Sequence, residues 1–349
     1  MSIAISSSGS TVEHDWVESV NFDRDGRQIS HVLLPNSHAP DGGANLLLPI
    51  AVFKNGPGPS LLLTGGNHGD EFEGPVALLK LIAEFESTRL RGRLIILPCL
   101  NPPAVLAGLR CSPLDGKNLN RVFPGRGTGS ISEVIADHIT QEILPRVEAV
   151  FDLHAGGRSS FIIPSVMMHY LDDSGLMART LAALKAFRAP VSMIIKESDT
   201  EGMFDTTVEK AGKVFICAEL GGGGILTPES VRIAEAGVRN VLIHYGMLEG
   251  EPATLSWRDW GKSRVLEVPD ARHYVKAPSD GLYEPLVELG ESVRPDQPLG
   301  RVHVPGSPGH TPIWVKSRTN GVLYSRRAAT VVHRGDGVAI VGEISQEHA

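Results

Sequence analysis

Short runs of aliphatic residues alternate with amphipathic segments between residues 60 and 248, and this alternation limits the chain to few folds. The predicted strands are residues 61–64, 93–97, 149–153, 191–195 and 214–219, and the predicted helices are residues 75–88, 132–147, 174–187 and 228–248. Strands that are apolar almost throughout and are joined by helices are typical of a mostly parallel sheet covered on both faces. We therefore expect an α/β fold that binds ligands at the carboxyl ends of its strands.

Composition divides the 349 residues into three parts. Residues 1–58 predict short strands that join the main sheet, with turns at Asp25-Gly26 and at residues 40–43. Residues 59–250 carry the alternation and form the predicted catalytic domain. Residues 251–349 change to short alternating segments separated by Gly and Pro, which predicts an all-β module similar to a biotinyl/lipoyl-type barrel-sandwich. The carrier lysine flanked by methionines is absent, so we expect a packing, oligomerising or site-covering role.

Charge and cysteine content exclude several classes of protein. A net charge of -7 without basic runs argues against nucleic-acid binding. Neither a signal peptide nor a membrane span is predicted, so a cytoplasmic protein is expected. Cys99, Cys111 and Cys217 are too few and too scattered for a disulfide framework or a cysteine metal site. The sequence leaves the oligomeric state open, and a homo-oligomer is compatible with it.

A candidate metal site is assembled from two distant segments. His68 and Glu71 lie three residues apart in a glycine-rich stretch directly after the first predicted strand, and His154 ends a later one. Two His and one Glu form a ligand set that holds zinc in hydrolases and leaves one position open for water. We expect one zinc ion per chain, bound by His68, Glu71 and His154.

Two further carboxylates accompany these ligands. Asp152 is interpreted either as an acceptor of a hydrogen bond from a ligand histidine or as a capping or salt-bridged carboxylate. Glu219 is the only charge in an otherwise apolar predicted strand and precedes four glycines. Because a buried charge is unfavourable unless it is paired or functional, Glu219 is the candidate general base, with a buried ion pair to an Arg as the alternative.

The polar segment from Asn101 to Gly125 supplies candidate anion-binding residues. Arg110 and Arg121 are suited to bidentate binding of a carboxylate or an oxyanion, although each taken alone is also compatible with a surface arginine. Because both lie in a loop at the expected ligand-binding edge of the sheet, anion binding and a surface position are equally compatible with the sequence.

Taken together, these motifs resemble the succinylglutamate desuccinylase/aspartoacylase family, which is related to zinc carboxypeptidases. The resemblance covers residues 60–250 and rests on motifs in a fixed order, namely Gly66-Asn67-His68-Gly69-Asp70-Glu71, Asn101-Pro102, Asn118-Leu119-Asn120-Arg121-Val122-Phe123-Pro124-Gly125, Asp152-Leu153-His154 and Glu219. It implies zinc on His68, Glu71 and His154, with Glu219 as general base and then general acid. It also implies that Arg110 polarises the scissile carbonyl, and that Asn120 and Arg121, with Asn118 beside them, bind the substrate carboxylate.

Within the family, the segment Asp115-Gly116-Lys117-Asn118-Leu119-Asn120-Arg121 is most similar to the branch that deacetylates N-α-acetyl-L-2,4-diaminobutyrate in ectoine degradation. The expected substrate is thus a small N-acyl amino acid. Its side-chain amine would need an acidic partner, for which the sequence offers four candidates: Asp70, Glu73, Asp115 and Glu133. The alternatives are a deacylase of another N-acyl amino acid, a zinc carboxypeptidase and a non-enzymatic metal-binding scaffold.

Overall fold

The centre of the molecule is a mixed sheet whose middle strands run parallel. The structure is a computed structural model that describes residues 17–18, 20–36, 45–195, 201–258, 263–307 and 309–345. The sheet has fifteen strands, and β4 pairs in parallel with β5 and β6, as β6 does with β10. Its main path has the order β1 (Val17–Glu18), β2 (Gly26–Pro35), β3 (Asn45–Asn55), β5 (Gly92–Leu97), β4 (Ser60–Gly65), β6 (Ala149–His154), β10 (Val214–Glu219), β8 (Ser165–His169), β9 (Val191–Ile195), β11 (Arg264–Glu267), β19 (Gly337–Ile344), β17 (Gly321–Arg327) and β14 (Ser292–Val293).

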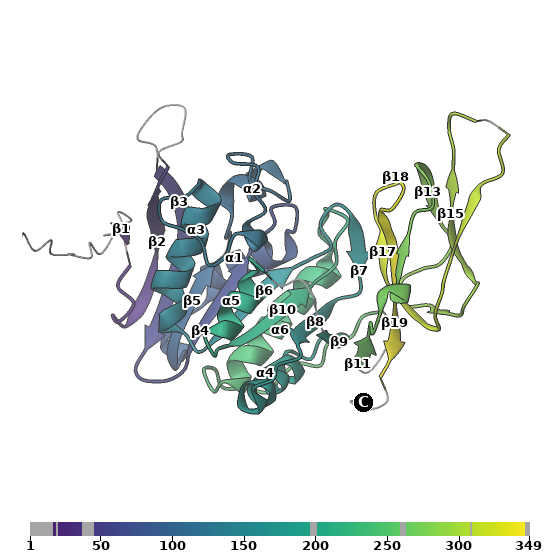
Figure 1. The fold of residues 1–349 in the computed structure, drawn as a ribbon. Coiled ribbons are helices and arrows are strands. Elements are labelled where there is room, and N and C mark those ends of the chain that lie inside the picture. The colour runs from purple at the N-terminus through teal and green to yellow at the C-terminus, as the bar shows by residue number, and fades with distance from the viewer. Residues whose placement is uncertain are drawn as a thin grey trace, which may run out of the picture.

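Helices cover both faces of the central strands (Figure 1). On β4, Leu61 and Leu63 pack into the core beneath α1, α4 and α6, whereas Leu62 between them packs into a second core beneath α3 and α5. Alternate side chains of a strand point to opposite faces, so an apolar strand such as β4 needs both layers. The helices are α1 (Glu73–Glu84), α2 (Pro102–Ala107), α3 (Ile131–His138), α4 (Ser174–Phe187), α5 (Phe204–Lys210) and α6 (Pro228–His244).

Three central strands end at one edge of the sheet. Glu219 of β10 lies beside His154 of β6 in the register, and Gly65 of β4 lies beside Leu153. The glycine-rich stretch with His68 and Glu71 begins immediately after β4. The sheet thus brings together four residues that are up to 151 positions apart, from His68 to Glu219.

Most of the predicted elements are present, with changes in extent. The helix expected over residues 75–88 ends at Glu84, and a turn of 3-10 helix follows at Ser87–Arg89. The helix expected over residues 132–147 is α3, continued by a π-helical turn (Ile139–Ile143) and a 3-10 turn (Leu144–Arg146). The expected turn at residues 40–43 lies outside the described residues. The sequence analysis did not predict β8, α2 or α5.

Parallel pairing occurs in two blocks of the sheet, β5-β4-β6-β10 and β8-β9-β11, so the expectation of a mostly parallel sheet holds only for these strands. β1, β2, β3 and β5 pair antiparallel in succession, and β8 runs antiparallel to β10. β2 and β3 pair along their whole lengths across a short connection, which excludes the crossover that parallel pairing needs.

The C-terminal part forms a separate antiparallel sheet and also extends the large one. Figure 1 shows this part beside the helices and the central strands. β12 (Tyr274–Lys276) pairs with β19, and β7 (Ser160–Ile162) pairs with β17, so strands of both regions share one sheet. A closed barrel does not appear among the described strands. The separate sheet has the order β16 (Ile313–Lys316), β15 (Pro298–His303), β13 (Gly281–Pro285) and β18 (Val331–Val332).

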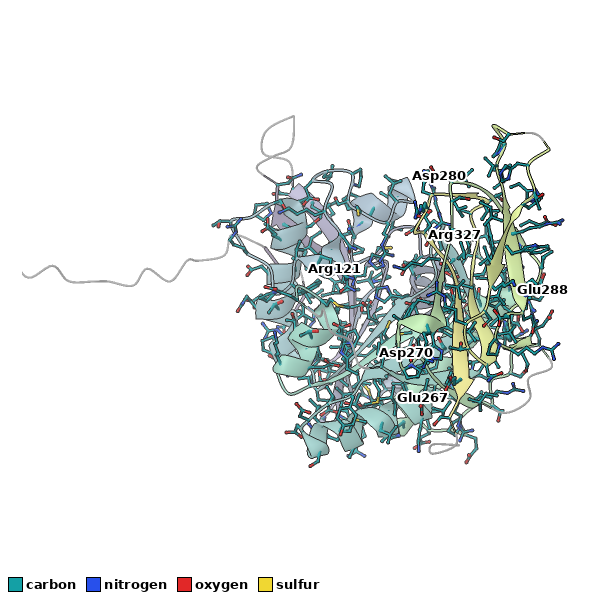
Figure 2. The ribbon with its side chains drawn as sticks, turned by 45° about the vertical axis from the view of Figure 1, so that its right-hand side comes forward. Arg121, Glu267, Asp270, Asp280, Glu288 and Arg327 are labelled. Carbon is teal, nitrogen blue, oxygen red and sulfur yellow. The ribbon has the colours of Figure 1, made fainter. Side chains whose placement is uncertain are left out.

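Labelled side chains locate the two parts in a second view. Figure 2 shows Arg121 on the part built from the central sheet, whereas Asp280, Glu288 and Arg327 lie on the C-terminal part. Within the described part of the chain, none of the helices has the length and apolar character needed to cross a membrane.

Candidate active site

The loop after β4 is fixed by glycines and by backbone hydrogen bonds. Gly66 has φ of 71°, in the left-handed region that favours glycine, and its carbonyl accepts from the Asn101 amide. A Cβ on Gly69 would lie 2.0 Å from the carbonyl carbon of Ala104. The loop therefore packs directly on α2, which fixes where His68 emerges.

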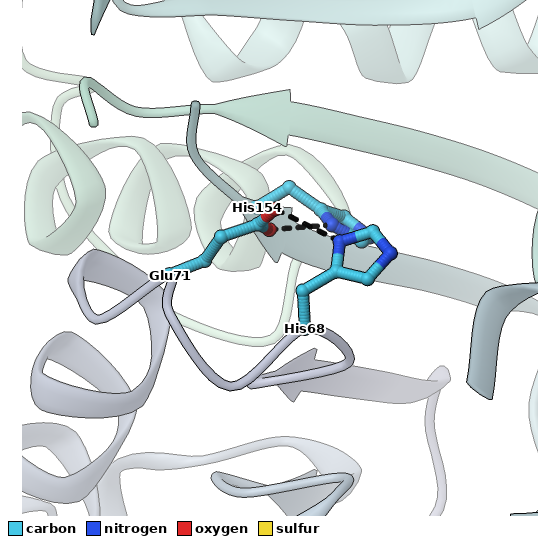
Figure 3. Close-up of side chains that lie close together, drawn as sticks. All are labelled: His68, Glu71 and His154. Atoms are coloured by element: carbon cyan, nitrogen blue, oxygen red, sulfur yellow. Dashed lines mark hydrogen bonds and ion pairs between the residues drawn. The ribbon is translucent and has the colours of Figure 1, made fainter. Parts of the chain in front are cut away.

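His68, Glu71 and His154 converge at the carboxyl edge of the sheet (Figure 3). The Glu71 carboxylate lies between the two imidazoles, with Oε1 2.8 Å from Nδ1 of His68 and Oε2 2.8 Å from Nδ1 of His154. All three side chains are buried, and one potential ligand atom from each lies within 4.8 Å of the other two. The structure therefore places the three predicted metal ligands in one group.

Asp152 orients His154. Nε2 of His154 lies 2.7 Å from Oδ2 of Asp152, which also accepts from the Asn67 amide, while Oδ1 accepts from the Thr64 hydroxyl. Of the two interpretations of Asp152, the structure shows the hydrogen bond to the histidine of the metal-ligand group. Such a contact fixes the tautomer and the ring orientation of a ligand.

The charges in this group favour a bound cation. Burial opposes ionisation of Asp152, but His154 and the hydrogen bonds outweigh it and lower the pKa of Asp152. An ionised Asp152 only accepts, so Nε2 of His154 carries a proton. Burial opposes a second proton on His154, but the carboxylates of Asp152 and Glu71 outweigh it and raise the pKa of His154 well above its usual value. The 2.8 Å contact between Nδ1 of His154 and Oε2 of Glu71 therefore holds a positive charge, which is either a proton on Nδ1 or a metal ion in its place. The two imidazoles and the carboxylate thus fit a divalent transition metal.

Arg110 reaches the same group from the loop that follows α2. Its Nη1 lies 3.3 Å from Oε1 of Glu71 and 3.4 Å from Nδ1 of His68. The side chain is 51% exposed, so its guanidinium is accessible from the cavity while it contacts the buried carboxylate. Arg110 is therefore placed beside the metal-ligand group rather than on a remote surface.

Glu219 lies at the end of β10 with a buried carboxylate oxygen. Oε2 has no hydrogen-bond partner, and in the described part of the chain no Arg or Lys forms an ion pair with this residue. Burial, reinforced by the negative charge of Glu71, raises the pKa of Glu219 to about 8. Glu219 therefore does not form the buried ion pair with an Arg that was the alternative interpretation. Its carboxylate, when ionised, is suited to accept a proton.

A cavity of about 160 Å³ joins these groups to the loop with Asn120 and Arg121. His68, His154, Arg110 and Glu219 line it, and so do Asn120 and Arg121. Asn118 is not among the lining residues; its Oδ1 accepts from the Asn120 amide at 2.9 Å and so fixes the backbone beside it. Two of the three predicted substrate-binding residues therefore face the cavity.

Three polar lining residues were missed by the sequence analysis: His169, Asp205 and Glu209. A signal for two of them exists, because Phe204 and Val208 are spaced like one face of a helix and the two acids repeat at the same spacing. His169 ends the unpredicted strand β8, and nothing in its local sequence marks it.

The four acids proposed for a side-chain amine lie elsewhere. Oδ2 of Asp70 accepts from the Arg158 amide, and Oε1 of Glu73 accepts from the Gly222 amide. Asp115 accepts from Ser132, and Glu133 forms an ion pair with Lys117. None of the four lines this cavity.

Comparisons with known proteins agree with this geometry. The chain matches the model of the succinylglutamate desuccinylase/aspartoacylase catalytic domain over residues 57–245. It is 44% identical over 325 residues to the N-alpha-acetyl-L-2,4-diaminobutyric acid deacetylase of Halomonas elongata, a match covering 93% of this chain and 94% of the relative.

Solved structures give the same result. The chain is similar to the product-bound ectoine utilization protein EutE (DoeB) of Ruegeria pomeroyi, with a TM-score of 0.90, 41% identity and coverage of 94% of this chain and 98% of the other. For a succinylglutamate desuccinylase/aspartoacylase of Rhodobacter sphaeroides the TM-score is 0.89, with 39% identity and coverage of 95% and 99%. The chain belongs to the succinylglutamate desuccinylase/aspartoacylase family of amide-bond hydrolases.

Proposed function

We propose that this protein is a zinc-dependent deacetylase of N-α-acetyl-L-2,4-diaminobutyrate in ectoine catabolism. The observation that carries the proposal is the single cavity lined by His68, His154 and the unpaired carboxylate of Glu219. The substrate follows the relative from Halomonas elongata, which matches nearly the whole chain at 44% identity.

His68, Glu71 and His154 are the residues that would hold one zinc ion. Two nitrogens and one carboxylate oxygen leave a coordination position open, as catalytic zinc sites require. When bound, zinc lowers the pKa of water and polarises a carbonyl group. Asp152 would support the site by accepting from Nε2 of His154, which leaves Nδ1 as the nitrogen that faces the metal.

The remaining residues bind the substrate and move its proton. Glu219 takes a proton from the attacking water and delivers it to the leaving α-amine. Arg110, beside Glu71, stabilises the negative charge that develops on the acetyl oxygen. Asn120 and Arg121, which line the same cavity, bind the α-carboxylate.

A substrate panel tests the proposal. Purified, zinc-loaded protein is assayed for released carboxylate with N-α-acetyl-L-2,4-diaminobutyrate, N-succinylglutamate, N-acetylaspartate and an unmodified dipeptide. We expect the highest kcat/KM with the first compound. Preference for the second or third would identify another deacylase of the family, dipeptide cleavage would indicate a carboxypeptidase, and zinc binding without turnover would indicate a scaffold.

A further inference from the structure

One wall of the cavity is acidic. Asp205 and Glu209 lie four positions apart on α5 and line the cavity together with His169 of β8. Nδ1 of His169 lies 2.9 Å from Oε2 of Glu209, and Nε2 lies 3.9 Å from Oδ2 of Asp205. The side chains of Asp205 and Glu209 are only 13% and 10% exposed, so what remains accessible faces the cavity.

The two carboxylates of this acidic wall, Asp205 and Glu209, can accept further hydrogen bonds from a cation. Among the described residues, His169 is the only ion-pair partner of either carboxylate. Oδ1 of Asp205 accepts from the amide and the hydroxyl of Thr206, whereas Oδ2 accepts no hydrogen bond from any described residue. Partly desolvated carboxylates of this kind bind ammonium groups strongly through charge-assisted hydrogen bonds.

The lining of the same cavity also carries positive charge. Arg110 and Arg121 contribute positive charge, and two buried polar atoms, Nε2 of His68 and Oε2 of Glu219, have no partner. These orphaned atoms show that the cavity is built to hold a ligand. Its lining therefore offers cations for one group of that ligand and carboxylates for another.

The acidic wall is fixed to the loop with Asn120 and Arg121. Oδ1 of Asn120 accepts from the backbone amide of Phe204, the first residue of α5. The carbonyl of Gly202 accepts from the Phe123 amide, and a Cβ on Gly202 would lie 2.5 Å from the carbonyl oxygen of Arg121. The two segments therefore pack without a gap, so the carboxylates have a set position relative to Asn120.

We propose that Asp205 and Glu209 bind the side-chain ammonium of the substrate and so select amino acids with a short cationic side chain. The inference rests on the proposed deacetylase function, in which Arg121 and Asn120 bind the α-carboxylate. Each charge of a zwitterionic substrate then meets a group of opposite charge in the cavity lining. Analogues with neutral or acidic side chains leave the two carboxylates partly desolvated without a partner, which disfavours them.

Two substrates that differ only in the amine test this inference. N-α-acetyl-L-2,4-diaminobutyrate and N-acetyl-L-2-aminobutyrate are assayed with the zinc-loaded wild type and with Asp205→Asn and Glu209→Gln. We expect each substitution to lower the ratio of the two kcat/KM values by roughly 10- to 100-fold, mainly through KM for the amine substrate, because the contact is present before and during reaction.

Matched variants separate recognition from folding. Asp172→Asn makes the same charge change at an exposed position outside the cavity, and we expect the wild-type ratio. Asp205→Glu keeps the charge and should retain more of the preference for the amine than Asp205→Asn does. Zinc content and thermal melting of every variant are recorded beside the kinetics.

The outcomes distinguish this inference from the proposed function. Wild-type turnover with a ratio that Asp205→Asn and Glu209→Gln leave unaltered overturns the inference alone, as does an equal loss on both substrates. A wild type that hydrolyses neither compound overturns the proposed function and the inference with it.

Discussion

Asp152 and His154 lie two positions apart on β6, and their side chains meet at 2.7 Å on one face of the strand. Residues i and i+2 of a strand point to the same side, so the strand itself sets this contact. Both side chains are buried. The spacing Asp-x-His thus places the carboxylate where it determines which nitrogen of His154 faces Glu71.

Replacing Asp152 with Ala is expected to weaken metal binding. Removal of such a supporting carboxylate lowers metal affinity by roughly 10- to 100-fold, because the imidazole loses its fixed tautomer and orientation. Competition with a chromogenic zinc chelator measures the change. Asp172→Ala is the control at an exposed site, and equal zinc affinity of the Asp152 variant and the wild type would contradict the assigned role.

Replacing Glu219 with Gln is expected to separate metal binding from turnover. The variant keeps the size of the side chain but cannot accept the proton of water, so kcat should fall by roughly 100- to 10,000-fold. Zinc content should stay stoichiometric, because Glu219 is not among the three ligands. Acetate release and atomic absorption measure the two quantities, with exposed Glu249→Gln as the control. Turnover within twofold of the wild type would remove Glu219 from the mechanism.

The sequence predicted the central strands and their helices because burial on both faces demands apolar runs. β4, with Leu61, Leu62 and Leu63, is unmistakable for that reason. The same logic placed His68, His154 and Glu219 together, since parallel strands end at a common edge. The sequence next to these residues marks them as functional, because glycines adjoin them and Glu219 is an isolated charge in an apolar strand.

Asp205 and Glu209 have only a weak local signal, the helical spacing that they share with Phe204 and Val208. α5 has seven residues, too few for a clear helical pattern, and its acids are typical of a solvated face. Its position depends on long-range contacts, such as that between Asn120 and the Phe204 amide. The acids first considered for the amine are close to the motifs in sequence, but sequence proximity did not place Asp70 or Glu73 in the cavity.

Replacing Gly69 with Ala is expected to displace the loop that carries His68. The new Cβ would meet the Ala104 backbone, so the loop with His68 or the start of α2 must shift. Overpacking of this kind lowers the free energy of unfolding by about 1–3 kcal/mol. Urea unfolding and zinc titration measure both effects. Gly306→Ala is the control, since nothing lies within 4 Å of its Cβ; equal stability and zinc affinity of the Gly69 variant would contradict the packing argument.

Replacing Glu73 with Gln is expected to flatten the pH dependence of stability. Burial raises the pKa of Glu73 to about 7, above the value of 4.5 for a free carboxyl group. Between these values the folded state holds a proton that the unfolded state has lost, so the free energy of unfolding falls as pH rises and levels off above pH 7. The loss from this group is about 3 kcal/mol. Urea unfolding of the metal-free wild type and variant from pH 4.5 to 8 measures it. Parallel curves for the two proteins would show that Glu73 is ionised in the folded state throughout this range.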